Sequence, residues 1–345
     1  MRTSFDLLVV GAGPVGLATA IEGALAGMQV AVIDPRQGSV DKACGEGLMP
    51  GARAALDRLG VEVAGWPFRG IRYADASVGG ERQVTAAFRR GPGLGVRRTE
   101  LSRGLAARAA ALGVERVSAR AGVPVQGDGW VQAAGLRASW LVAADGLHSP
   151  IRRALGLEAP AVGTRRFGLR RHYAVAPWAD VVEVYWAHDA EAYVTPVDAD
   201  TVGVAVLCGG GGGYDEWLDR FPALRQRVAG APVASTVRGA GPLRQRATRR
   251  VAGRVLLAGD AAGYVDALTG EGIAVGLAGA RALVGCLVAG SPESYESAWC
   301  RVSRRYRVLT HGLLWSAQQR VVRRAIVPAA RAMPAVFGAV VNRLA

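Results

Sequence analysis

The chain has 345 residues, half of them hydrophobic, which is enough for one large domain or two medium ones with a substantial core. Its formal net charge is +14, but no nucleic-acid-binding motif accompanies the arginines, so we expect a small-molecule substrate and no nucleic-acid partner. The four cysteines lack a CxxC pattern and the four histidines lack metal-ligand spacing, which predicts the reduced thiols of a cytoplasmic protein and no bound metal.

The first elements that the sequence predicts form a βαβ unit, with no signal peptide expected before it. Its parts are a strand at 5–10, the turn Gly11-Ala-Gly13-Pro14-Val-Gly16, a helix to about Gly27 and a strand at 29–33. The first glycine permits the tight turn, the second lets the backbone approach a pyrophosphate, and the third lets helix and strand pack closely. The turn, Pro14 included, is therefore expected to contact the phosphates of a dinucleotide at the helix N-terminus.

Asp34, at the end of the second strand, and the nearby Arg36 are the expected contacts of the adenosine half of this dinucleotide. The carboxylate of Asp34 can accept hydrogen bonds from both hydroxyls of the ribose. It would repel a 2′-phosphate, which disfavours NADP at this position and leaves NAD and FAD.

Between residues 163 and 208 the pattern alternates between apolar and polar residues. The runs RFGLRRHYAVA, VVEVYWA, EAYVTPV and TVGVAVL predict four antiparallel strands. Alternation alone does not decide which face of these strands points inward.

A second glycine-rich strand, turn and helix extends from residue 254 to residue 280. A simple NAD dehydrogenase does not need this element, whereas FAD extends well past its pyrophosphate and requires further contacts. We expect Gly259 and Asp260 to bind the ribityl chain, and the helix start Gly270-Glu271-Gly272 to face the pyrimidine edge of the flavin. The N–H groups there would stabilise the anionic, reduced flavin. Any single glycine here is also compatible with an ordinary turn.

The C-terminal part of the chain predicts helices at about 272–289, 292–310 and 311–345, with a break at Pro328. Residues 301–345 contain nine arginines and no aspartate or glutamate. This charge predicts either a solvated helical face or a peripheral contact of a cytoplasmic protein with an anionic membrane or an acidic partner. The sequence leaves the oligomeric state open.

These elements together resemble the flavoprotein group of the single-component aromatic hydroxylases and the geranylgeranyl-reductase-like enzymes, over roughly residues 4–290. The resemblance depends on the first glycine turn, on DGLHSPIR at 145–152 and on AGDAAGYVDALTGEGI at 258–273. In RRTELSRGL, Arg98 matches an arginine that reaches the FAD from a helix start in this family. Asp145 belongs, by resemblance, to a segment linked to both FAD and NAD(P)H.

The resemblance implies an α/β fold, with a Rossmann-like FAD-binding domain of the glutathione-reductase and aromatic-hydroxylase type, an inserted antiparallel β-sheet substrate domain and C-terminal helices. We assign 1–65, 95–160 and 245–290 to a discontinuous FAD-binding domain, 66–94 and 161–244 to the substrate domain, and 291–345 to a helical tail. The family has no separate nicotinamide domain, so NADPH or NADH is expected to bind only transiently.

The segment KACGEGLMPGARAALDRLG at 42–60 looks like the cysteine-glycine segment that lies against the flavin in geranylgeranyl-reductase-like proteins. Cys44 and Gly45 are therefore expected cofactor contacts, with Cys44 either a redox thiol or a small packed residue. Lys42, the sole lysine, is a candidate catalytic residue that contacts the flavin or an anionic substrate, unless its position is due to chance.

In this family the inserted sheet covers the flavin, and its inner face lines the substrate pocket. Tyr185, Tyr193 and Pro196 are the candidate substrate contacts. His172 is a candidate base for deprotonating a phenol, with a surface histidine as the alternative.

The leading functional hypothesis is an FAD-dependent monooxygenase of secondary metabolism, in which NAD(P)H reduces the flavin and a flavin C4a-hydroperoxide hydroxylates an aromatic or polyketide-type molecule. The alternative is a C=C reductase of the geranylgeranyl-reductase type that acts on an isoprenoid or other lipophilic alkene. The segment at 42–48 and the basic, apolar tail favour this alternative. The chain lacks the WxWxIP element and the second lysine of a halogenase.

Overall fold

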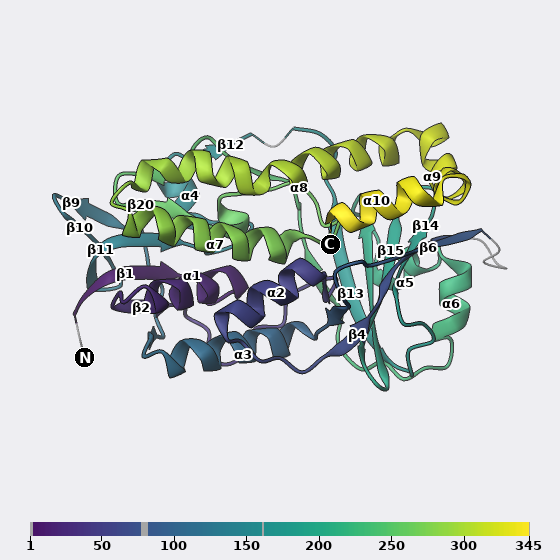
Figure 1. Ribbon diagram of the computed structural model, residues 1–345, viewed down its shortest axis with the longest axis horizontal. Coiled ribbons are helices and arrows are strands. Elements are labelled where there is room, and N and C mark those ends of the chain that lie inside the picture. The colour runs from purple at the N-terminus through teal and green to yellow at the C-terminus, as the bar shows by residue number, and fades with distance from the viewer. Residues whose placement is uncertain (1–2, 77–81, 161, 345) are drawn as a thin grey trace.

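The computed structural model describes residues 3–76, 82–160 and 162–344 of an elongated molecule (Figure 1). One end contains an eight-stranded sheet with the order β19-β20-β11-β1-β2-β8, which β10 and β9 extend beside β11. The central strand β1 pairs in parallel with β2 and β11. The strands are β1 (Ser4–Val10), β2 (Val30–Ile33), β8 (Glu115–Val117), β9 (Val125–Gly127), β10 (Trp130–Ala133), β11 (Leu136–Ala143), β19 (Val251–Ala252) and β20 (Val255–Leu257).

The predicted βαβ unit is confirmed, with helix α1 (Pro14–Leu25) between β1 and β2. Gly11 has a φ of +106°, and a Cβ on it would lie 2.4 Å from the carbonyl oxygen of Ala144. A Cβ on Gly16 would lie 1.9 Å from the carbonyl oxygen of Gly11. Both positions therefore require glycine, one for its conformation and both for the close approach of two backbones.

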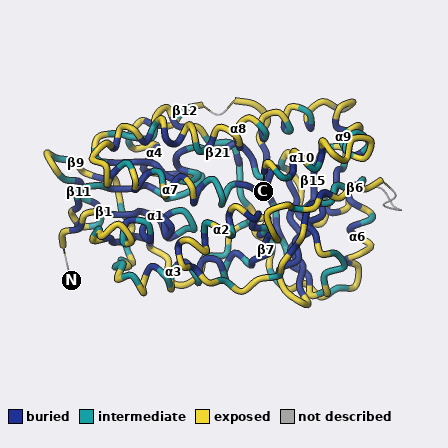
Figure 2. The backbone as a smooth tube through the Cα atoms, in the orientation of Figure 1, coloured by how far each residue is buried: buried dark blue, intermediate teal, exposed yellow. Residues whose placement is uncertain are grey.

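Helices cover this first sheet. Helix α1 packs against α3 (Arg98–Ala111) and α7 (Gly272–Val288), and α7 packs against α8 (Tyr295–Gln318). Strand β20 leads through the short helix η1 (Gly259–Ala261) to α7, as the second glycine-rich segment predicts. The other helices at this end are α2 (Pro50–Leu59), α4 (Pro150–Ala154) and η2 (Pro292–Ser294). The strands and the inner helix faces are buried together as one apolar core (Figure 2).

The second sheet has seven strands in the order β17-β13-β16-β15-β14-β5-β6. The four strands predicted between residues 163 and 208 are present, and their mutual pairs are antiparallel. The sheet is nevertheless mixed, because β5 enters from the segment before α3 and pairs in parallel with β14. The strands are β5 (Gly70–Asp75), β6 (Gln83–Ala87), β13 (Phe167–Ala174), β14 (Val182–Trp186), β15 (Glu191–Asp198), β16 (Thr201–Cys208) and β17 (Arg238–Ala240).

Two small sheets link the ends of the molecule. One consists of β3 (Gly47–Leu48), β7 (Gly93–Gly95) and β4 (Trp66–Phe68), and the other of β12 (Glu158–Ala159), β18 (Gln245–Ala247) and β21 (Gly263–Tyr264). Helices α5 (Tyr214–Leu218) and α6 (Pro222–Val228) cover one face of the seven-stranded sheet. Apolar side chains of the C-terminal helices pack against its other face.

The C-terminal helices differ from the prediction in their boundaries. Helix α8 continues through residue 311 to Gln318, α9 (Arg320–Ala332) contains Pro328, and α10 (Pro334–Leu344) follows. The break falls at Met333 rather than at Pro328, because the residue before Pro334 is sterically driven out of the helical conformation. Among the described residues, no single helix has the length and apolarity of a membrane span. The segments 321–332 and 334–344 have this length and apolarity only when taken together, and they are bent by 102° relative to each other.

A buried chain of alternating charges fixes α9 against the seven-stranded sheet. Arg323 of α9 contacts the carboxylate of Glu191 at 2.7 Å, and Arg166 contacts the other oxygen of that carboxylate at 2.6 Å. Arg166 also contacts Asp266, in the segment before α7, at 2.9 Å. All four side chains are buried, so each charge depends on its neighbours for compensation.

Candidate active site

A cavity with a volume of about 1280 Å³ lies between the two sheets. At one end it is bordered by the turn before α1, by residues 42–47, by η1 and by the start of α7. At the other end it is bordered by the seven-stranded sheet and by helices α9 and α10. We refer to it as the main cavity. Most of its charged side chains belong to the segments of the first end, where the sequence predicts the cofactor, and Arg170 reaches the cavity from β13 of the seven-stranded sheet.

The predicted dinucleotide-binding turn borders this cavity, and the space in front of its second glycine is open. Gly13 and Pro14 line the cavity, and a Cβ on Gly13 would meet no atom within 4 Å. Asp145 also lines the cavity, and its buried Oδ1 has no hydrogen-bond partner among the described residues. Burial raises the pKa of Asp145. A long cofactor with polar groups, such as FAD, fits this cradle.

Asp34 is the buried carboxylate that the sequence assigns to the ribose. Its Oδ2 accepts a hydrogen bond from the backbone N–H of Ala12 at 2.8 Å, and Arg36 donates to both of its oxygens. Burial opposes the negative charge, but the hydrogen bonds from Arg36 and Ala12 outweigh it and lower the pKa of Asp34 to about 2. Asp34 is therefore ionised at neutral pH. It is 1% exposed and does not line the main cavity, so its contact with a ribose stays a prediction.

Lys42, Arg98 and Asp260 come together at the polar end of the main cavity from three separate segments. Burial raises the pKa of Asp260, while the charges of Lys42 and Arg98 lower it. Burial, followed by the charge of Arg36, lowers the pKa of Lys42. The Nζ of Lys42 would lie 3.5 Å from a Cβ on Gly146, so the sole lysine points toward the DGLHSPIR segment. Its catalytic role stays a prediction.

The start of α7 lines the cavity as the sequence predicts. Gly270 and Gly272 border the cavity, and Glu271 is the N-cap residue of the helix. The carboxylate of Glu271 is buried, and its Oε2 has no hydrogen-bond partner among the described residues. Burial outweighs the charge of Arg305 and raises the pKa of Glu271 to about 7. Glu271 can thus exist in either protonation state near neutral pH.

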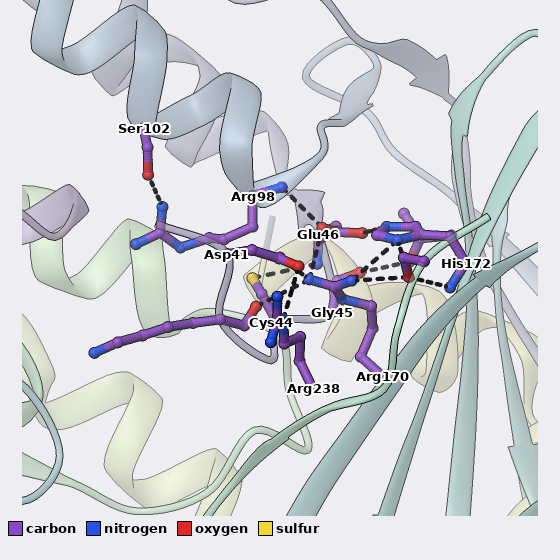
Figure 3. Close-up of polar contacts among 12 residues, drawn as sticks. Asp41, Cys44, Gly45, Glu46, Arg98, Ser102, Arg170, His172 and Arg238 are labelled. Carbon is purple, nitrogen blue, oxygen red and sulfur yellow. Dashed lines mark hydrogen bonds and ion pairs between the residues drawn. The ribbon is translucent and has the colours of Figure 1, made fainter. Parts of the chain in front are cut away.

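Glu46 connects the cofactor end of the main cavity to the seven-stranded sheet (Figure 3). Its Oε1 accepts a hydrogen bond from the backbone N–H of Arg98 at 2.8 Å, and its Oε2 lies 2.6 Å from Nε2 of His172. A guanidinium can only donate, so Nδ1 of His172 accepts from Arg170 at 3.0 Å. Nε2 of His172 then donates to Oε2 of Glu46.

The same segment is held by further contacts to the sheet (Figure 3). Arg170 donates to the carboxylate of Asp41 and, at 3.2 Å, to the carbonyl oxygen of Lys42, while Arg238 contacts Asp41 at 3.1 Å. Thr195 donates to the carbonyl oxygen of Gly45 at 2.7 Å. Residues 41–46 are thus fixed by strands β13, β15 and β17, and not only by their own loop.

Cys44 lies in this segment and lines the main cavity. Burial raises the pKa of its thiol, so the group is protonated at neutral pH. No second cysteine contacts it among the described residues, and all four cysteines are free. The structure therefore agrees with a packed, protonated thiol at the cofactor end of the cavity.

The expected roles of His172 and Tyr185 need correction. His172 is 1% exposed, so it is not a surface histidine, and it does not line the main cavity, because it pairs with Glu46. Tyr185 lies on β14, where Val182 and Val184 line the cavity. Strand alternation therefore places Tyr185 on the opposite face of the sheet. There Tyr185 packs in the core under α5 and α6 and donates to Glu183.

Of the remaining substrate candidates, Tyr193 lines the main cavity and Pro196 does not. The hydroxyl of Tyr193 donates to the carbonyl oxygen of Leu268 at 2.8 Å. A Cβ on Gly95 would lie 1.7 Å from the carbonyl oxygen of Pro196, so Pro196 packs against β7 instead. Glu46 and Arg170 were not predicted from the sequence. For Glu46 the sequence did contain a signal, because this acidic residue lies between Gly45 and Gly47 in the segment expected at the flavin.

This fold and site define an FAD-binding flavoprotein of the aromatic-hydroxylase and geranylgeranyl-reductase-like group. Residues 4–68 and 107–292 match the family model described as an FAD binding domain, and the chain belongs to this family. It is 31% identical to a menaquinone reductase of Mycolicibacterium smegmatis, over 87% of this chain and 80% of the relative. It is 30% identical to digeranylgeranylglycerophospholipid reductase 1 of Methanopyrus kandleri, over 78% of this chain and 76% of the relative.

Solved structures share this fold at low sequence identity. A flavoprotein/dehydrogenase from Cytophaga hutchinsonii superimposes with a TM-score of 0.83 at 16% identity, over 98% of this chain and 92% of that chain. The halogenase PltM, in complex with phloroglucinol and FAD, superimposes with a TM-score of 0.74 at 16% identity, over 87% and 73% of the two chains. These structures establish the shared fold, and the family model identifies the cofactor as FAD.

The role of Asp34 predicts a loss of flavin affinity on its removal. In Asp34→Ala, FAD loses charge-assisted hydrogen bonds of about 1.5–3 kcal/mol each, so we expect the Kd for FAD to rise at least ~10-fold. Titration of the apoprotein with FAD, followed by flavin fluorescence, measures this change. Asp260→Ala is expected to weaken binding as well, whereas Asp57→Ala, on the exposed face of α2, is the control. Unchanged affinity in both site variants would refute the assignment.

The contacts of Glu46 predict a local loosening of the flavin segment. In Glu46 the two carboxylate oxygens accept from Arg98 and from His172, but in Glu46→Gln only one oxygen remains and the NH₂ group faces one of these donors. We therefore expect the free energy of unfolding to fall by about 1–3 kcal/mol. Hydrogen exchange of residues 41–46 should accelerate with it. Glu62→Gln, at an exposed position, provides the matched control. Equal protection of 41–46 in the two variants would contradict the assigned role.

Proposed function

We propose that this flavoprotein reduces carbon–carbon double bonds in a lipophilic, isoprenoid-type substrate. The observation that supports this most strongly is the main cavity, which extends from the FAD segments to a wall of apolar side chains on α9 and α10. Typical members of this wall are Ile326, Ala329, Phe337 and Val341. An isoprenoid chain has no polar groups and therefore fits a long cavity whose wall on α9 and α10 is apolar.

The relatives support the same class of reaction. Both are named as reductases, one of menaquinone and one of digeranylgeranylglycerophospholipid, and the match covers 80% and 76% of their lengths. The chemistry that bound FAD would supply is hydride transfer from reduced nicotinamide, NADH or NADPH, to one alkene carbon. The second alkene carbon must receive a proton from the protein or from water.

We assign that proton to the thiol of Cys44. The thiol lines the main cavity at its polar end, and burial keeps it protonated by raising its pKa. Backbone N–H groups at the start of α7 stabilise negative charge at the same end. Lys42 and Arg98 add two further cations there. The apolar wall holds the substrate chain and excludes water from the reacting carbons.

Hydroxylation with O₂ stays a prediction of the sequence that the cavity supports less well. Its expected phenol base, His172, is buried outside the main cavity and already bonded to Glu46. Tyr193 does line the cavity, but its hydroxyl donates to a backbone carbonyl. The apolar side chains of α9 and α10 offer no hydrogen-bonding group to the hydroxyl of a phenolic substrate.

Anaerobic turnover tests the reaction. We expect the dithionite-reduced holoenzyme to convert a prenylated quinone or geranylgeranyl lipid into a product two hydrogens heavier, as measured by mass spectrometry. In D₂O both added hydrogens should be deuterium, because dithionite supplies only electrons and the hydride of the reduced flavin then also comes from solvent. Cys44→Ala should lower the rate by roughly 10²–10⁴-fold, as expected for loss of a general acid. Cys286→Ala, outside the main cavity, is the control. Absence of alkene reduction together with phenol-stimulated oxygen consumption would instead establish the monooxygenase.

We also propose that the substrate enters from an anionic membrane surface. Met333, Val336 and Val340 line the main cavity and are still 53%, 57% and 42% exposed, so the cavity opens through apolar side chains of α9 and α10. Val322 of α9 also lines the main cavity and is 36% exposed. The surrounding residues 301–345 carry arginines and no acidic residue, which complements anionic lipid.

Vesicle sedimentation tests this surface. We expect the protein to sediment with vesicles of phosphatidylglycerol and phosphatidylcholine but only weakly with phosphatidylcholine alone. Val336→Asp removes about 1.5 kcal/mol or more of apolar burial and should weaken binding at least ~10-fold. Val123→Asp changes an equally exposed valine (64%) outside the main cavity and should have no effect. Equal binding of both variants would rule out this face.

A further inference from the structure

A second cavity, of about 330 Å³, lies between α7, α8 and the small sheet of β18 and β21. Its cationic side chains come from two segments, with Arg244, Arg246 and Arg250 on one side and Arg307 of α8 on the other. His311 of α8 also lines it, and burial and the neighbouring arginines lower the pKa of this imidazole. We refer to it as the basic pocket. No residue of the glycine turn at 11–16 lines it, so it is separate from the dinucleotide cradle.

The charges of the basic pocket are largely uncompensated. Among the described residues, Arg244, Arg246 and Arg307 form no ion pair with a carboxylate, and Arg250 forms one, with Glu296 at 3.5 Å. Asp260 is the single carboxylate in the lining, and burial raises its pKa. A pocket with this excess of positive charge attracts an anion.

The interior of the basic pocket offers hydroxyl groups that lack partners. The hydroxyl of Tyr295 and Oγ of Ser303 are both buried, at 0% and 1% exposed, and neither has a hydrogen-bond partner among the described residues. A buried polar group without a partner costs free energy, which a bound ligand would recover. The pocket thus has unpaired hydroxyl groups inside and cations at its exposed rim.

Two of the arginines are already held in place. The guanidinium of Arg250 lies 3.9 Å, and that of Arg307 5.4 Å, from the ring centre of Trp299, which also lines the pocket. Stacking on an aromatic ring leaves the N–H groups of a guanidinium free to donate in its plane. Rigid guanidinium groups and free hydroxyls are the donors that bind phosphate oxygens in proteins.

We infer that the basic pocket binds the phosphate or diphosphate group of a small molecule. The site is independent of the proposed alkene reduction, although Gly259, Asp260, Tyr264 and Gly272 line both cavities and place the two sites side by side. Two classes of small molecule could supply this phosphate group. One is a phosphorylated nucleotide, such as the reduced nicotinamide that serves as reductant, and the other is a prenyl diphosphate.

Isothermal titration of the FAD-saturated full chain with inorganic pyrophosphate tests the pocket, because bound FAD occupies the dinucleotide cradle. We expect saturable one-site binding, and in Arg307→Gln a Kd raised roughly 10-fold or more, since one charge-assisted hydrogen bond is lost. Ser303→Ala should raise the Kd by a smaller factor. Arg304→Gln lies on the same helix outside the pocket and should change the Kd less than two-fold. Unaltered FAD content and thermal unfolding verify that the variants are folded.

Competition then identifies the source of the phosphate. Displacement of pyrophosphate by adenosine 2′,5′-bisphosphate supports a nucleotide, displacement by geranyl diphosphate supports a prenyl diphosphate, and displacement by neither leaves a free inorganic anion as the ligand. The inference is overturned if pyrophosphate does not bind the holoprotein. It is equally overturned if Arg304→Gln weakens binding as much as Arg307→Gln, because the attraction would then come from net charge alone.

Discussion

The cofactor end of the molecule depends on the buried carboxylate of Glu46. This side chain accepts hydrogen bonds from the start of α3, through the N–H of Arg98, and from the seven-stranded sheet, through His172. Glu46 has a φ of 59°, a conformation that a non-glycine residue adopts only at a cost, so its contacts must offset that cost. Together with the contacts of Arg170, Thr195 and Arg238, this group holds the segment that carries Lys42 and Cys44 in place (Figure 3).

The far end of the main cavity depends on a second buried electrostatic element. Arg323 of α9, Glu191, Arg166 and Asp266 form a continuous chain from the cavity opening to the segment before α7. Because removal of one member would leave an uncompensated buried charge, the chain resists separation of α9 from the sheet. Charged side chains therefore fix the two ends of the cavity, while apolar side chains pack to form the wall between them.

This arrangement would let one molecule combine polar cofactor chemistry with the lipophilic substrate that we propose. Charged groups gather where FAD is expected, and apolar side chains continue from the cavity to an exposed face of α9 and α10. The basic pocket lies on the other side of η1 and α7, so phosphate groups and apolar chains would approach the flavin segment from different directions. Fold similarity alone does not separate reductase from hydroxylase, because both reactions use this cofactor and architecture.

The sequence by itself determined the βαβ unit, the second glycine-rich segment and FAD as the cofactor, because these depend on local backbone requirements such as those of Gly11 and Gly16. It also predicted the strands of the substrate sheet from their alternation. Only the tertiary structure decided that Tyr193 and not Tyr185 faces the cavity, since the inward face depends on what packs against it. It likewise paired His172 with Glu46, 126 residues away, a contact that no local pattern encodes.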